Sequence, residues 1–199
     1  MRLWLARHAR PLVAPGTCYG AGEVMADAAH TLESAALLAQ VLPPALPVRT
    51  SPRLRCTALA DALAQLRPDL HPAPDARLAE MDFGSWEGRS WDAIGQAAID
   101  TWTADFARHR CGGGESVSDL LARVAQALAE ACDGRRDMLW ITHAGVARAV
   151  RVLTAPPMAL DAAAWPREGP AFGAVECTTL DAQRLRASLR ENAHARGCP

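Results

Sequence analysis

Short apolar runs alternate along the chain with longer stretches whose apolar residues recur at helical spacing. Runs of strand length are Leu3–Ala6, Pro47–Thr50 and Met138–Thr142. Helical spacing occurs at His30–Leu42, which ends before two prolines, and at 90–107. Because strands that alternate with helices form parallel sheets covered on both faces, the pattern predicts an α/β fold with three layers, α/β/α, and a mainly parallel central sheet.

Two serines predict the starts of further helices. Ser51 can cap a helix that has Pro52 at its first position and an apolar stripe over 54–66. Ser116 can cap another helix, with a stripe over 120–131. Each of these helices follows or precedes a strand-like run, as the alternating pattern requires.

The end of the chain has a different period. Apolar and polar residues alternate over 184–190, which predicts a half-exposed strand paired as a hairpin with Ala174–Leu180. Residues 194–199 are expected to form a loose tail. A chain of 199 residues can hold one full core, so we expect a single domain over 1–193.

The first strand-like run leads into Arg7 and His8, and the run Met138–Thr142 leads into His143. Buried strands of α/β proteins carry reactive groups at their carboxyl ends. A neutral imidazole there can act as a nucleophile, and a neighbouring guanidinium can hold an anion against it. Taken alone, a histidine after a strand is more often structural than catalytic.

Four segments of the chain, when taken together, point to one protein family, although no single segment would. They are Arg7-His8, Ser51–Cys56, Leu78–Gly88 and Trp140–Val146. In this order and spacing they resemble the histidine phosphatase superfamily, with its phosphoglycerate mutase-like fold, from residue 2 to about residue 180. The segment Pro11–Gly20 is further similar to the α-ribazole phosphatase-like branch.

The resemblance implies that the two histidine-bearing strands are neighbours, which the sequence alone does not show. It implies that His8 accepts a phosphoryl group, while Arg7 and Arg55 neutralise the phosphate oxygens and His143 stabilises charge. Backbone N–H groups of Ala144 and Gly145, at the start of a helix, are expected to complete the cradle.

Arg10 and the acids near residue 80 leave choices open. Arg10 either adds a further cation near the phosphate or points away from it. By resemblance Glu80 protonates the leaving group and then activates water, with Asp82 as the second choice. Glu87 is expected to belong to a structural turn.

Composition narrows the classes of function. The net charge of −1 gives no reason to expect nucleic acid or an anionic membrane as a partner, and lysine chemistry is excluded because all 21 basic residues are arginine. No signal peptide or membrane span is expected. The six cysteines show no CxxC pair, which favours reduced thiols in the cytoplasm. We expect no cofactor and no metal, and a monomer or a homodimer.

Two departures from the family pattern matter. Ala9 stands where the family has glycine, which would cost about 1 kcal/mol if the backbone there has positive φ, and would otherwise narrow the pocket. The segment Gly20–Val24 lacks the arginine and aspartate commonly found in the α-ribazole phosphatase-like branch. The substrate is therefore less well specified than the reaction.

The sequence thus predicts a metal-independent phosphomonoesterase that acts through a phosphohistidine on a small-molecule phosphate, with α-ribazole 5′-phosphate as the leading candidate. A mutase that returns the phosphoryl group to another hydroxyl is an alternative, and a non-catalytic phosphate-binding protein is another. A metallohydrolase ranks last, because acids and histidines at ligand spacing are absent from the sequence.

Overall fold

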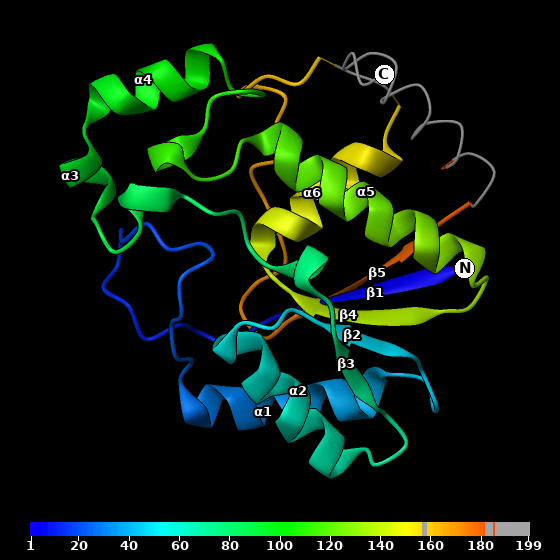
Figure 1. Cartoon of the computed structure of the whole chain (residues 1–199). Coiled ribbons are helices and arrows are strands. Elements are labelled where there is room, and N and C mark those ends of the chain that lie inside the picture. Colours follow the sequence, from blue (N-terminus) through cyan, green and yellow to red (C-terminus); the bar gives the residue numbers. More distant parts are fainter. Residues whose placement is uncertain (157–158, 182–184, 186–199) are drawn as a thin grey trace.

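The computed structural model describes residues 1–156, 159–181 and 185, and its centre is a five-stranded sheet in the order β3-β2-β4-β1-β5 (Figure 1). The strands are β1 (Arg2–Arg7), β2 (Val48–Thr50), β3 (Pro72–Pro74), β4 (Met138–Thr142) and β5 (Val175–Thr179). Neighbouring strands from β3 to β1 are parallel, and β5 is antiparallel to β1. The mainly parallel sheet of the predicted fold class is confirmed.

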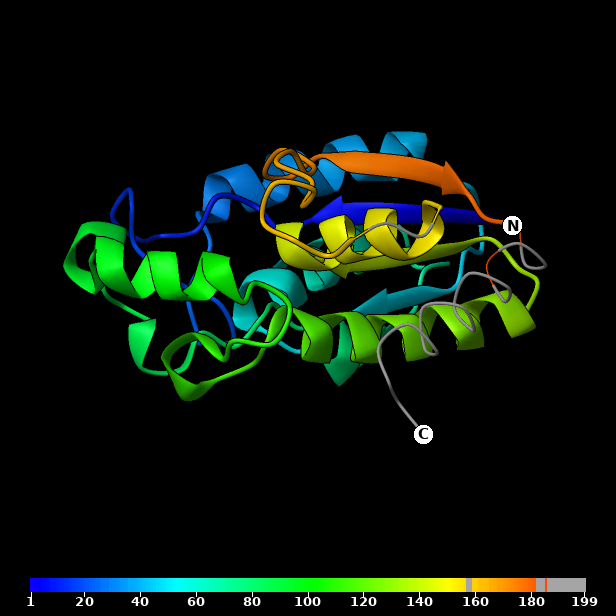
Figure 2. The same cartoon turned by 90° about the horizontal axis from the view of Figure 1, so that it is seen from above.

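Helices cover both faces of the sheet. They are α1 (Ala28–Val41), α2 (Leu54–Leu66), α3 (Trp91–Ile94), α4 (Gln96–Ala104), α5 (Val117–Asp133) and α6 (Ala144–Thr154), with 3-10 turns η1 (Ala76–Leu78), η2 (Gly84–Trp86) and η3 (Cys111–Gly113). Figures 1 and 2 show α1 and α2 on one face, α5 and α6 on the other, and α3 with α4 beyond the end of the sheet toward which β1 points.

The two core layers follow from the alternation of side chains along each strand. In β1, Leu3 and Leu5 pack with α5 and α6, whereas Ala6 packs with α1 and α2. In β4, Trp140 joins the first layer and Ile141 the second. Because successive strand residues point to opposite faces, a continuously apolar strand is required for a sheet buried on both sides.

The predicted cap at Ser116 is confirmed, and the one at Ser51 is wrong. Ser116 and Asp119 form a reciprocal capping box at the start of α5. The helix predicted from Ser51 instead begins at Leu54, with Arg53 as its N-cap and no side-chain cap bond. The Ser51 hydroxyl oxygen accepts from the N–H of Arg53 at 3.3 Å, before the helix begins, and it also lies 2.8 Å from Nε2 of His143.

The helical stretch predicted over 90–107 is two helices. Ser90 caps the short α3 by accepting a hydrogen bond from the N–H of Ala93, and the chain then passes through Gly95 at φ +90° before α4 begins. That conformation suits glycine and interrupts the helix. Strand β3 was not predicted, because two prolines lack an N–H; its place at the edge of the sheet tolerates them.

The C-terminal prediction is tested in part. Residues 175–179 form the predicted strand, and it pairs with β1. The expected partner strand over 184–190 is wrong at Leu185, which is helical and donates its N–H to the Asp181 carbonyl at 2.9 Å. The other residues of that range lie outside the described residues, as do the expected tail over 194–199 and the end of the predicted domain at 193. Within the described parts of the chain, no helix is long and apolar enough to cross a membrane.

Candidate active site

The two predicted histidines meet at the carboxyl ends of adjacent strands. Arg7 pairs with Thr142 in the β1–β4 register, and the N–H of His8 donates to the Thr142 carbonyl at 3.1 Å. His8 and His143 each follow directly, and their ring centroids are 5.1 Å apart. The parallel sheet therefore fixes the backbones of both histidines, as the resemblance implied.

His8 is held as a neutral imidazole with one defined tautomer. Its Nδ1 lies 2.7 Å from the carbonyl oxygen of Ala9, which can only accept, so Nδ1 carries the hydrogen. Burial, aided by the positive charges of Arg55 and Arg7, lowers the pKa of His8 to about 3. Nε2 therefore carries a lone pair and is the nucleophilic atom of the ring.

Ala9 is accommodated without strain. It is fully buried, its backbone φ is not positive, and it does not line the cavity described below. The strained and the pocket-narrowing readings of this departure from the family pattern are therefore both wrong. Its carbonyl oxygen, which orients His8, would be supplied equally by any residue.

A cavity of about 310 Å³ opens next to His8, and its wall has two unlike ends. The polar end is formed by Arg7, His8, Tyr19, Glu80, Ala144 and Gly145. The aromatic end is formed by Phe83, Trp91, Trp102, Phe106 and Trp165.

Arg7 presents its guanidinium to the polar end. Its Nη1 donates to the Pro170 carbonyl at 3.0 Å, and the group lies 3.7 Å from the ring centroid of Phe172. Its Nε is buried and has no hydrogen-bond partner within the described residues. A half-buried cation with an unused donor, beside a neutral nucleophile, fits an anion such as a phosphoryl group.

Arg55 and His143 lie behind the wall. Both are fully buried, and neither lines the cavity. The Arg55 guanidinium donates to the carbonyls of Gly20 and Gly22 and lies 5.5 Å from the ring centroid of Tyr19. In this structure, then, Arg55 reaches the polar end through its charge, and Tyr19 occupies the wall in front of it.

His143 is also neutral. Its Nε2 contacts Ser51 at 2.8 Å and the Cys56 sulfur at 3.5 Å. Burial, together with the positive charge of Arg55, places the pKa of His143 well below its ordinary value. The ring can donate a hydrogen bond, but it brings no positive charge to the site.

Of the three candidate acids, only Glu80 lines the cavity. Its Oε2 accepts from the N–H of Gly145 at 3.0 Å, and its Oε1 accepts from the N–H of Met81 at 3.1 Å. A Cβ on Gly145 would come within 2.1 Å of Glu80 Oε1, so any side chain there would push the Glu80 carboxylate from its position. The Gly145 N–H, predicted to face phosphate, is thus engaged with the acid in this structure.

The other two acids hold loops. Asp82 accepts from the N–H of Gly84 at 2.7 Å and stabilises the η2 turn. Glu87 accepts from three backbone N–H groups, those of Ala21, Gly22 and Phe83. Glu87 is therefore structural, as expected, and Asp82 does not reach the cavity.

Arg10, the candidate further cation, is exposed and does not line the cavity. Its backbone N–H donates to Nδ1 of His30. A cation that the sequence reasoning missed does line the cavity: Arg148, one turn after Ala144 on α6, whose Nη2 donates to the Arg167 carbonyl at 2.9 Å. Its i+4 spacing from Ala144 was the available signal.

Tyr19 was also missed as a site residue, although its segment carried part of the resemblance. Burial raises the pKa of its hydroxyl, which therefore stays protonated, and Arg7 and Arg55 partly oppose that shift. Within the part of the chain that the structure describes, no group of three His, Cys, Asp or Glu side chains is arranged to hold a metal ion.

The aromatic end is built from rings that pack on each other. Trp91 and Trp102 are stacked with 12° between their planes, and Trp102 stacks on Phe106 at a centroid distance of 5.4 Å. Phe83 meets Trp91 edge to face, and Trp165 meets Phe106 in the same way. This wall offers planar apolar surface of the kind that binds another aromatic ring.

Known proteins resemble this chain in sequence and in fold. Residues 3–188 match the family model described as "Histidine phosphatase superfamily (branch 1)". The fold is similar to that of the protein TTHB049 from Thermus thermophilus, with 27% identity over 89% of this chain and 92% of the other, and a TM-score of 0.68. None of the curated proteins compared with the chain matches it.

Two structures at lower identity share the fold. One is a putative α-ribazole-5′-P phosphatase from Escherichia coli, with 24% identity, 92% of each chain covered and a TM-score of 0.75. The other is a mycobacterial glucosyl-3-phosphoglycerate phosphatase, with 24% identity, 88% of each chain covered and a TM-score of 0.73.

Proposed function

Because the chain belongs to branch 1 of the histidine phosphatase superfamily, we propose that it is a phosphomonoester hydrolase working through a phosphohistidine on His8. The observation that carries this proposal is the neutral His8 ring, whose Nδ1 is fixed by Ala9 while its Nε2 is free to attack. His8 lines the same cavity as Arg7 and Glu80, so a nucleophile, a cation and an acid share one small space.

In the first step, His8 Nε2 attacks phosphorus and the bond to the leaving oxygen breaks. Glu80, in its protonated form, gives its proton to that oxygen. Arg7 holds the non-bridging oxygens, while Arg55 contributes charge and His143 a hydrogen-bond donor from behind the wall. Arginine and histidine groups thereby supply the charge stabilisation that a metal ion supplies in other phosphatases.

In the second step, water attacks the phosphohistidine. Glu80, now a carboxylate, accepts a proton from that water, the nitrogen–phosphorus bond breaks, and inorganic phosphate leaves. His8 regains its lone pair and Glu80 its proton. One carboxyl group thus serves both steps, which fits the single candidate acid in the cavity wall.

The aromatic end supports a substrate whose leaving group carries a planar ring. Stacking on a ring such as Trp102 contributes about 0.5–1.5 kcal/mol beyond the burial of area. α-Ribazole 5′-phosphate, which carries such a ring on a ribose phosphate, is the candidate we favour. The fold shared with an α-ribazole-5′-P phosphatase agrees with this choice.

The reaction is tested by turnover of an aryl phosphate in the presence of EDTA, with vanadate as inhibitor. We expect turnover that EDTA leaves unchanged and that vanadate stops. Activity that disappears with EDTA and returns with a divalent cation would instead identify a metallohydrolase. Phosphate binding without turnover of any phosphomonoester would identify a binding protein.

The substrate is tested by comparing α-ribazole 5′-phosphate with ribose 5-phosphate, which has the same reacting group and no ring. A phosphorylated sugar acid forms the third arm, because Arg148 could bind its carboxylate. We expect kcat/KM to be highest for α-ribazole 5′-phosphate. Equal values for the first two compounds would contradict a role of the aromatic end in recognition.

A further inference from the structure

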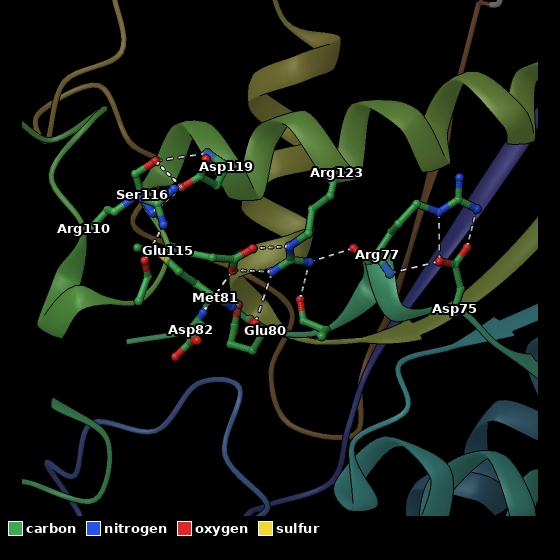
Figure 3. Close-up of polar contacts among 12 residues, drawn as sticks. Asp75, Arg77, Glu80, Met81, Asp82, Arg110, Glu115, Ser116, Asp119 and Arg123 are labelled. Carbon is green, nitrogen blue, oxygen red and sulfur yellow. Dashed lines mark hydrogen bonds and ion pairs between the residues drawn. The ribbon is translucent and has the colours of Figure 1, made fainter. Parts of the chain in front are cut away.

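An arginine next to the loop that carries Glu80 donates five hydrogen bonds. Arg123, on α5, donates through Nε and Nη2 to the two carboxylate oxygens of Glu115, at 2.8 and 3.0 Å. Its Nη1 donates to the carbonyls of Arg77 and Ala79, both at 2.7 Å, and its Nη2 donates to the carbonyl of Glu80 at 3.1 Å. Figure 3 shows Arg123 facing this loop from the helix above it.

Glu115 binds the same loop two residues further along, at Asp82. Its Oε2 accepts from the N–H of Asp82 at 3.1 Å, and its own N–H donates to the carbonyl of Asp82 at 2.7 Å. The side chains of the pair are largely buried, with 17% of Arg123 and 23% of Glu115 exposed. The two residues therefore hold the backbone on both sides of Glu80 as well as at Glu80 itself.

The segment needs this support because no regular structure supplies it. Residues 79–83 lie between η1 and η2 and belong to no helix or strand. A loop without a ladder of backbone hydrogen bonds would otherwise move by more than a proton transfer tolerates, since a displacement of 1 Å can cost about 10²-fold in rate. The planar, five-donor guanidinium can bind a carboxylate and three carbonyls together, which an ammonium group cannot.

We propose that the Arg123–Glu115 pair is a positioning device for the general acid, fixing the backbone of residues 77–82 so that the carboxyl of Glu80 stays in the cavity wall. The inference rests on the proposed function of Glu80. Arg123 does not line the cavity, so it acts through Glu80 and is a positioning residue, not a catalytic one.

The chain contains a matched control. Arg67 donates to both oxygens of Asp69, each at 2.7 Å, and to the carbonyls of Ala39, Leu42 and Pro43, each at 3.0 Å. It therefore makes the same kind of bonds at the ends of α1 and α2, where no residue of the cavity lies. Loss of either arginine should cost stability, but only loss of Arg123 should affect the acid.

The experiment measures leaving-group release in a single turnover for Arg123→Lys and Arg67→Lys. The substrates are an alkyl phosphate, which needs a proton on its leaving oxygen, and a nitrophenyl phosphate, which needs little. For Arg123→Lys we expect release from the alkyl phosphate to slow by about 10- to 100-fold, with less than about a threefold change for the nitrophenyl phosphate. Arg67→Lys should match wild type on both substrates while lowering the thermal midpoint.

The same measurement in a Glu80→Gln background shows whether Arg123 affects leaving-group release through Glu80. Once the acid is gone, Arg123→Lys should slow the alkyl phosphate no further. If instead it slows both substrates equally, or adds its full effect to that of Glu80→Gln, the positioning role is overturned. If Arg123→Lys does not fold, Glu115→Ala, which keeps the three carbonyl bonds of Arg123, is judged by the same two criteria.

A different set of results is expected if the proposed phosphatase function itself is wrong. If wild type turns over no phosphomonoester, or if Glu80→Gln matches wild type on both substrates, the proposed function or the proposed acid is wrong. If Glu80→Gln discriminates between the leaving groups and Arg123→Lys does not, the acid stands and the positioning proposal alone fails.

Discussion

The two ends of the cavity are built by different means. At the polar end, His8 directly follows β1, and His143, behind the wall there, directly follows the paired strand β4, so the hydrogen bonds of the sheet fix both backbones. The aromatic end comes largely from α3, α4 and the turns beside them, outside the sheet, and α4 has no fully buried residue (Figure 1). We infer that the sheet determines the reaction, while the more loosely attached aromatic wall determines the substrate.

If this division holds, the largest loss of catalytic activity should come from a substitution at or directly behind the polar end. We expect His143→Ala to lower kcat by about 10³-fold, as removal of a charge-stabilising donor does elsewhere. The loss should be similar for substrates with and without an aromatic ring. A loss confined to aromatic substrates would show that His143 takes part in substrate recognition, and it would contradict the division between the two ends.

Glu80→Gln should have the next largest effect on activity. Because a poor leaving group must be protonated as it departs, the variant should slow an alkyl phosphate by about 10²-fold and a nitrophenyl phosphate far less in single-turnover release. Asp82→Asn can still accept from Gly84 and should resemble wild type. The opposite pattern between these two variants would show that the wrong carboxyl has been chosen.

The polar end should also make the fold sensitive to acid. The folded pKa values of His8 and His143 lie below the unfolded value of about 6.5, so below that pH the unfolded chain binds protons that the folded chain does not. His8, with a folded pKa of about 3, should therefore lower the free energy of unfolding by about 2 kcal/mol between pH 6.5 and 5, and His143 should act in the same direction.

Urea unfolding at several pH values tests this sign. His143→Ala should make the fall in unfolding free energy below pH 6.5 less steep, and Trp102→Ala should not change it. An equal pH dependence in His143→Ala and wild type would show that His143 is protonated in the folded protein.

The smallest effect on activity is expected at the aromatic end. Trp102→Ala should raise KM for α-ribazole 5′-phosphate by up to about tenfold and leave kcat and the KM for ribose 5-phosphate nearly unchanged. Trp4→Ala removes the same side chain from a strand outside the cavity wall and serves as control. A large fall in kcat for Trp102→Ala would show that the two ends are not separable.

The same division explains what could be predicted from the sequence. Apolar strands followed by Arg7-His8 and by His143 are local patterns, and the fold class follows from their alternation with helices. The capping box at Ser116 is equally local. The adjacency of the two strands and the choice of Glu80 came only from the family resemblance, because both depend on contacts between distant parts of the chain.

Other features have no local pattern. Arg123 binds backbone carbonyls, which every residue possesses, so nothing in the sequence indicates its partners. Ser51 fits a helix cap in sequence, but α2 has Arg53 as its N-cap, and the Ser51 hydroxyl also contacts His143, 92 residues away. The burial of Arg55 behind Tyr19 likewise depends on the path of the loop before α1.

The central claim is that His8 forms the bond to phosphorus, and rapid quenching with labelled substrate tests it most directly. The account predicts an adduct that is stable to alkali and labile to acid, as a phosphoramidate is, and that is absent from His8→Ala. His143→Ala should form the same adduct more slowly. Label on His143, or an adduct that persists in His8→Ala, would contradict the account.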